Sequence, residues 1–102
     1  MTIRSEQLDK DTMVLFLSGR LDTVSSSKCE LELNKILIKG TFNIIFDLKE
    51  LDYISSSGLH VLLQTQKMMA VNNRKLVIRN IGGVVKDVFD MTGFSTIFTF
   101  EE

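Results

Sequence analysis

Three consecutive serines, Ser55, Ser56 and Ser57, precede Gly58 near the middle of the chain. An apolar segment leads into them and an amphipathic segment follows, so the pattern predicts a strand, a tight turn and a helix. The first turn of a helix has unpaired backbone N–H groups and a partial positive charge, which favour a side-chain oxygen or a phosphate group. The hydroxyls are therefore either helix caps or a site of covalent modification.

Ser56, His60 and Asp22 are also the residue types of a hydrolase triad. However, His60 follows Ser56 by four residues on the same predicted helix, where we expect its side chain to face solvent. The Gly-x-Ser-x-Gly pattern of a nucleophile elbow is absent. These features argue against a hydrolase, and we expect the chain not to be an enzyme.

Two further patterns are weak signals of phosphate chemistry. Gly82 and Gly83 precede a predicted helix, but neither the dinucleotide-binding fingerprint nor a Walker lysine accompanies them, so they are better explained as a helix start. Asp47 and Asp52 flank a predicted strand, as in a phospho-aspartate receiver. No acidic residues early in the chain supply the metal-binding partners that a receiver needs.

Composition limits the class of protein. The length of 102 residues predicts one domain, residues 1–102, and 44% hydrophobic with 25% charged residues argues against a disordered chain. A net charge of -1 gives no basic surface for nucleic acid. Cys29 and His60 are single residues of their kinds, so we expect no disulfide and no metal site. We expect no cofactor. No apolar run of membrane-spanning length occurs, and we expect a cytoplasmic protein without membrane insertion.

The hydrophobic pattern predicts an α/β fold with a mixed, mostly parallel sheet of about five strands, helices packed against it and an N-terminal antiparallel hairpin. The expected strands are Thr2–Leu8, Met13–Leu17, Asn43–Leu48, Lys75–Arg79 and Ile97–Phe100. The first helix is expected to begin with Thr23 or a neighbouring serine as cap and to end at Gly40. The second begins near Ser57, and the third runs from Gly82-Gly83 to the segment Met91–Phe94.

Apolar spacing assigns an inner face to each helix. The predicted core positions are Cys29, Leu33, Ile36 and Leu37 in the first helix, Leu59, Leu62, Leu63, Gln66, Met69 and Ala70 in the second, and Val84, Val85, Val88 and Phe89 in the third. Two apolar pairs, Val61 with Met68 and Leu31 with Ile38, are expected on outer faces. They either contact a partner or cover the edge of the core.

Sites in open α/β sheets gather beyond the carboxyl ends of the strands. Asp22 follows the second predicted strand, and Ser55 to Gly58 follow the third. We therefore expect both segments to lie on the same rim of the sheet.

Three segments of the chain resemble the STAS domain family, and within it the stand-alone bacterial anti-sigma factor antagonists. LSGRLDTVSSSKCE is similar to the family's L-x-G-x-L-D turn into the first helix. FDLKELDYISSSGLHVLL resembles its strand, switch loop and second helix, and GGVVKDVFDMTGFSTIF its last helix and strand. Together they span nearly the whole chain in the order of the family.

The resemblance implies that Ser56 accepts phosphate from a partner kinase, with Ser57 at the small-hydroxyl position and Gly58 as the glycine of the loop. Asp22 matches the acidic residue near that loop, whereas Ser55 stands where the best-known members have aspartate. Partner binding is expected at Asp22, Ser55, Ser57, Gly58, His60 and Val61.

The implied partners are an anti-sigma factor that is a GHKL-type serine kinase and a PP2C-type phosphatase, with the domain a monomer or weak dimer. Phosphorylation is expected to release the kinase. The alternative is a STAS accessory or regulatory subunit of a membrane transport system, in which the loop serines are only caps and the outer apolar pairs are the docking surface.

Overall fold

The N-terminal hairpin confirms the predicted antiparallel start of the chain. In the computed structural model, which describes residues 1–40 and 42–101, the second strand of this hairpin also pairs in parallel with two later strands. The strands are β1 (Thr2–Asp9), β2 (Thr12–Leu21), β3 (Asn43–Asp47), β4 (Leu51–Ile54), β5 (Leu76–Arg79) and β6 (Thr99–Phe100). Their order is β1-β2-β3-β5-β6, with β4 paired to β2, and every pair except β1–β2 is parallel.

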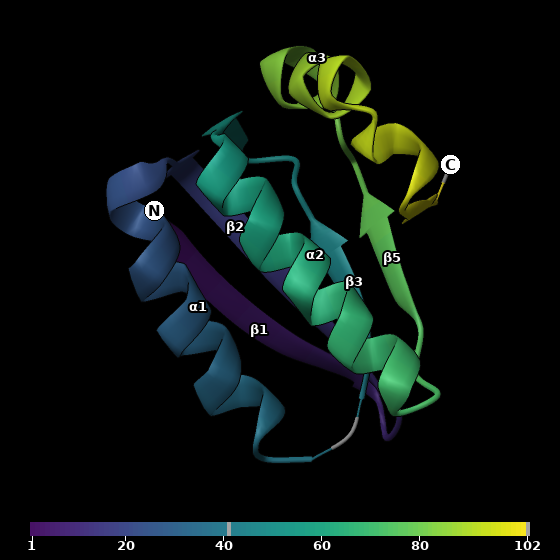
Figure 1. Ribbon diagram of the computed structural model, residues 1–102. Helices are drawn as coiled ribbons and strands as arrows, with labels where there is room; N and C mark the ends of the chain where they lie inside the picture. Colours follow the sequence, from purple (N-terminus) through teal and green to yellow (C-terminus); the bar gives the residue numbers. More distant parts are fainter. Residues whose placement is uncertain (41, 102) are drawn as a thin grey trace.

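Two helices cover one face of this sheet, and a third lies near its upper end in Figure 1. The helices are α1 (Thr23–Leu37), α2 (Ser56–Val71) and α3 (Gly83–Thr92), and a 3-10 turn, η1, follows at Phe94–Thr96. α1 and α2 pack against each other, whereas α3 contacts β4 and η1. All three helices begin where a strand has just ended, as the alternating pattern predicts.

β4 is the one strand that the hydrophobic pattern did not predict, so the sheet has six strands rather than about five. Burial does not alternate regularly along its four residues, since Leu51 and Ile54 are buried and Asp52 is exposed. β4 forms because β2 continues to Leu21, beyond the predicted end at Leu17. Gly19 makes this extension possible: its φ of 89° lies in the left-handed region at a register shift, and its N–H donates to the Glu50 carbonyl at 3.1 Å.

The ends of several other helices and strands differ from the predicted ends by a few residues. α2 begins at Ser56, one residue before the predicted start, and α1 ends at Leu37, three residues before Gly40. The last strand is only Thr99–Phe100, because η1 occupies the residues just before the predicted start at Ile97. The single large omission is therefore β4.

The predicted core residues are partly confirmed. Those that are buried are Cys29, Leu33, Leu59, Leu62, Met69, Val85 and Phe89. The predictions for Ala70 and Val84 are wrong, since both are exposed, and Val61 was wrongly expected outside. Val61 is 5% exposed, because α2 packs against α1 as well as against the sheet and therefore buries a wider part of its own surface. Burial raises the pKa of the Cys29 thiol to about 11.

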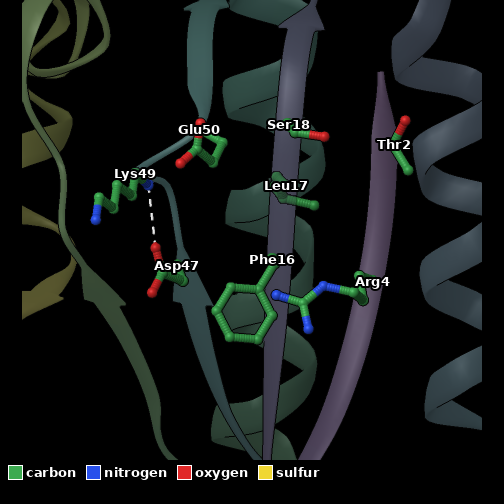
Figure 2. Close-up of a pocket in the computed structure, with 8 residues that line it drawn as sticks. All are labelled: Thr2, Arg4, Phe16, Leu17, Ser18, Asp47, Lys49 and Glu50. Carbon is green, nitrogen blue, oxygen red and sulfur yellow. Dashed lines mark hydrogen bonds between the residues drawn. The ribbon is translucent and has the colours of Figure 1, made fainter.

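The face of the sheet opposite the helices carries one cross-strand row of charged and aromatic side chains. Strand register places Arg4 opposite Phe16, Phe16 opposite Asp47, and Asp47 opposite Arg79. The Arg4 guanidinium carbon lies 4.2 Å from the centroid of the Phe16 ring, and that of Arg79 lies 5.9 Å from it. Figure 2 shows Arg4 extending toward Phe16 across this face.

Asp47 is the most heavily bonded carboxylate in the described part of the chain. Its Oδ2 accepts bonds from Arg79 Nη2 at 2.9 Å, Arg79 Nε at 3.0 Å and Asn80 Nδ2 at 3.0 Å, and its Oδ1 accepts from Lys49 N–H at 3.0 Å. Burial raises the pKa of Asp47, but these hydrogen bonds outweigh it and hold the pKa below its ordinary value of 3.8. Through these hydrogen bonds Asp47 links the end of β3 to Lys49, two residues later, and to Asn80, the residue after β5.

We expect Asp47→Asn to lower the free energy of unfolding by about 1–3 kcal/mol at pH 7, because the half-buried Arg79 loses a charged acceptor. The folded pKa lies below the unfolded one, so the contribution of the carboxylate is present above about pH 4 and is lost as the pH falls through the folded pKa. Urea unfolding of both proteins between pH 7 and pH 3 measures this. The difference in the free energy of unfolding between the two proteins should become smaller as the pH falls. Asp52→Asn, at an exposed carboxylate, should change the free energy of unfolding little.

Candidate functional site

Ser55 is the N-cap of α2. Its backbone is extended, with φ −94° and ψ 173°, and its Oγ accepts a hydrogen bond from Gly58 N–H at 3.1 Å. Its own backbone N–H donates to the Leu21 carbonyl at 2.8 Å. Ser55 therefore satisfies one of the unpaired N–H groups of the first helical turn and connects the turn to the end of β2.

Ser56 is the first residue of α2, and its side chain is exposed. Among the described residues, no hydrogen bond within the chain uses its hydroxyl. The neighbouring Ser57 is half-buried, and Gly58 is buried. The three serines of the sequence pattern thus occupy three different environments, which their spacing alone does not distinguish.

Gly58 lies close to the ends of β2 and β4. A Cβ atom at this position would lie 2.7 Å from Leu21 Cγ and 2.9 Å from both Ile54 Cγ1 and the Leu21 carbonyl oxygen. Ile54 and Leu21 are fully buried side chains, and the third atom belongs to the backbone, so none of the three can move away easily. Glycine is required here for close approach.

Asp22 is the N-cap of α1, a role that the sequence pattern had assigned to Thr23 or a neighbouring serine. Its Oδ1 accepts from Ser25 N–H at 3.0 Å, and its backbone N–H donates to Ser25 Oγ at 3.0 Å, which completes a capping box. The hydrogen bond from the Ser25 backbone, followed by that from its hydroxyl, lowers the pKa of Asp22. Asp22 therefore carries a negative charge at neutral pH.

Asp22 and Ser55 lie on the same rim, as predicted, but Ser55 follows β4 and not the predicted strand Asn43–Leu48. Leu21 pairs with Ile54 in the β2–β4 ladder, and the residues that follow them are the two helix caps. One step earlier in the ladder, the Arg20 guanidinium carbon lies 4.5 Å from the centroid of the Tyr53 ring. Sequence reasoning missed this pair because it depends on β4.

His60 is exposed on α2, and its Nε2 lies 3.2 Å from Gln64 Nε2, one turn further along the helix. No hydrogen bond among residues 1–40 and 42–101 joins it to Ser56 or to Asp22, so the site has no bonded Ser-His-Asp arrangement. Val61, which was expected at the partner surface, is buried beside α1. It supports the position of α2 and does not present its side chain to solvent.

The rest of the described chain supplies few other ligand groups. Its His, Cys, Asp and Glu side chains form no group of three that could hold a metal ion. None of its helices has the length and apolar character needed to cross a membrane. Gly82 caps α3 with an extended φ of −168°, in agreement with a helix start at these glycines.

We expect Gly58→Ala to destabilise the protein by about 1–3 kcal/mol, because the new methyl group overpacks against Leu21 and Ile54. The higher helix propensity of alanine recovers about 1 kcal/mol at most. Thermal unfolding measures the difference. Gly82→Ala is the matched control, since a methyl group there would meet no atom within 4 Å beyond its chain neighbours, and its effect should be smaller than that of Gly58→Ala.

Comparison with known proteins agrees with this arrangement. The chain is 32% identical over 98 residues to BtrV of Bordetella bronchiseptica, whose name describes an anti-sigma factor antagonist, with 96% of this chain and 84% of BtrV aligned. It is 26% identical over 97 residues to the anti-sigma-B factor antagonist of Listeria monocytogenes, with coverage of 95% and 85%.

Solved structures share the fold. SpoIIAA in its unphosphorylated form superposes with a TM-score of 0.77 at 17% identity, covering 99% of this chain and 88% of SpoIIAA. Bacillus SpoIIAA in its phosphorylated form gives 0.74 at 19% identity, with coverage of 99% and 92%. The sequence model of the STAS domain family matches residues 3–102 of this chain. Because this match extends over nearly the whole chain, the chain belongs to the STAS domain family.

Proposed function

We propose that this protein is an anti-sigma factor antagonist that acts by partner switching in the bacterial cytoplasm. The unphosphorylated form binds an anti-sigma factor that is also a GHKL-type serine kinase, and this frees the sigma factor. The kinase phosphorylates Ser56, the complex separates, and a PP2C-type phosphatase restores the first form. The observation that carries the proposal is the exposed side chain of Ser56 at the N-terminus of α2, whose hydroxyl forms no hydrogen bond with the described residues.

The environments of the three serines favour Ser56 as the acceptor. Phosphorylation of Ser55 would modify the oxygen that caps Gly58 N–H, and Ser57 is half-buried in the turn. Modification of Ser56 disturbs neither the cap nor the close contact at Gly58. Ser55 also caps the helix as the aspartate of other members would, but without adding a negative charge beside the phosphate.

The chemistry belongs to the kinase. The Ser56 oxygen attacks the γ-phosphorus of ATP, the new O–P bond replaces the bond to ADP, and the hydroxyl proton passes to a base of the kinase. The phosphatase later hydrolyses the same O–P bond and releases inorganic phosphate. This chain therefore supplies a substrate hydroxyl and a binding surface, and no catalytic group is assigned to it.

Phosphorylation adds about −1.5 to −2 units of charge at pH 7. At a helix N-terminus this charge stabilises by roughly 0.3–1 kcal/mol, so the free domain is expected to keep its fold. A partner packed on the same turn meets a dianion, and unfavourable charge juxtaposition costs several kcal/mol. About 2.7 kcal/mol is enough to weaken binding a hundredfold. The effect at the interface exceeds the effect on the fold, so binding is lost without unfolding.

We expect Ser56→Ala to retain the kinase from a lysate of the native host and Ser56→Asp to release it, with an affinity difference of about a hundredfold or more. Paired pull-downs read by mass spectrometry measure this. Equal retention of a kinase by both baits would contradict partner switching at Ser56. Transport proteins held equally by both baits would instead support the accessory-subunit alternative.

Ser55→Ala separates the cap from the acceptor. It should lower the free energy of unfolding by about 1 kcal/mol, because Gly58 N–H loses its partner. With the captured kinase and ATP, this variant should still gain one phosphate by intact-mass spectrometry, whereas Ser56→Ala should gain none. Loss of phosphorylation in Ser55→Ala alone would move the acceptor to Ser55.

A further inference from the structure

One edge of the sheet is long and uncovered. β1 spans eight residues, and within the described residues it pairs on one side only, with β2. All of its residues except Ile3 are exposed, although Ser5 and Gln7 point to the same face of the sheet as the buried core residue Leu15. α1 lies beside this edge in Figure 1, and Thr2 and Ile3 at the beginning of β1 line a shallow hollow together with Lys28 and Glu32 of α1.

The protection of this edge against pairing with another strand rests on charged side chains, Arg4 and Glu6, whose opposite signs do not repel a second copy of the same strand. Natural edge strands are commonly very short, carry charged side chains or proline, or are interrupted by bulges. β1 contains neither proline nor lysine, and its register with β2 is regular from Thr2 to Gln7. By contrast β6, at the opposite end of the sheet, has only two residues. The outer N–H and C=O groups of β1 are therefore open to a strand of another chain.

The sequence of β1 complements itself in antiparallel register about Ser5. In this register Ser5 lies opposite Ser5 of a second copy, Arg4 opposite Glu6, Glu6 opposite Arg4, and Ile3 opposite Gln7. Both cross-strand charge pairs are then favourable, and they repeat because the pairing is symmetric. We propose that two copies of this protein associate through β1 as a symmetric dimer, which joins their sheets into one continuous sheet.

Arg4 and Glu6 share one face of β1, where the Arg4 guanidinium leans inward over β2 and turns outward in the dimer to meet a second copy. Arg4 lies over the Phe16 ring and forms an ion pair with Glu6 on the same face of β1. In the dimer each guanidinium also faces the carboxylate of the other copy, so the two ion pairs become a group of four charges.

The proposed dimer leaves the serine turn free. Ser56 follows β4, at the carboxyl end of the strands, whereas the two-fold axis lies at the middle of β1 on the outer edge. The dimer therefore does not depend on phosphorylation of Ser56, and a monomeric protein would leave the proposed phosphorylation unaffected.

Cysteine cross-linking tests the register. Ser5→Cys places two thiols directly opposite each other, with Cα atoms about 4.5–5.5 Å apart, which a disulfide can bridge. Gln7→Cys is the matched control on the same face, because its two copies would be displaced by four residues, about 13 Å along the strand. The native Cys29 is buried with a pKa raised to about 11, so it does not compete.

We expect Ser5→Cys to form a disulfide-linked dimer at least tenfold faster than Gln7→Cys under mild oxidation. Equal rates, or faster linkage of Gln7→Cys, would overturn the proposal. Because both substitutions lie at exposed positions, a difference in folding is not expected, and circular dichroism checks it.

Charge reversal tests the same interface without cysteines. Arg4→Glu turns both cross-strand pairs into repulsion and should raise the dimer dissociation constant about tenfold or more in sedimentation equilibrium. The double variant Arg4→Glu with Glu6→Arg restores opposite charges within and between chains and should recover the dimer. A native protein that sediments as a monomer from micromolar to millimolar concentration, or a dimer that Arg4→Glu does not weaken, would refute this interface.

Discussion

The hydrogen bond from Ser55 N–H to the Leu21 carbonyl, 2.8 Å long, joins the two turns that define the site. It is possible only because β4 pairs beside the end of β2, and because Gly58 lets α2 start in contact with Leu21 and Ile54. Two helix N-termini are thereby held at one rim of the sheet. The position of every hydroxyl in the serine turn follows from this constraint.

The side chains at this rim have two roles: two of them cap helices, and that of Ser56 is exposed to solvent. Ser55 and Asp22 cap α2 and α1, and their oxygen atoms are used in these bonds. Ser56 lies one residue inside α2, exposed and without a bond in the described chain. A site of modification benefits from this arrangement, because a new charge on Ser56 meets the favourable end of the helix and leaves the caps in place.

A separate row of charged side chains crosses the face of the sheet opposite the helices and reaches its outer edge at β1. Asp47 joins β3 to β5 through Arg79, and Arg4 and Arg79 both lie near Phe16. This row stabilises a face that no helix covers, and it ends at β1, whose outer edge is open. The rim and the edge are separate surfaces of the sheet.

The sequence by itself determined the α/β class, the N-terminal hairpin, the three helices and the rim that brings Asp22 near Ser55 to Gly58, because hydrophobic period, glycines and capping residues are local signals. It also pointed to Ser56 through a resemblance of motifs. Only the tertiary structure decided that β4 exists, that Val61 is buried, and which serine caps the helix. These depend on contacts between segments far apart in the chain: β4 on the extension of β2 past Gly19, and Val61 on the packing of α2 against α1. Local patterns do not contain that information.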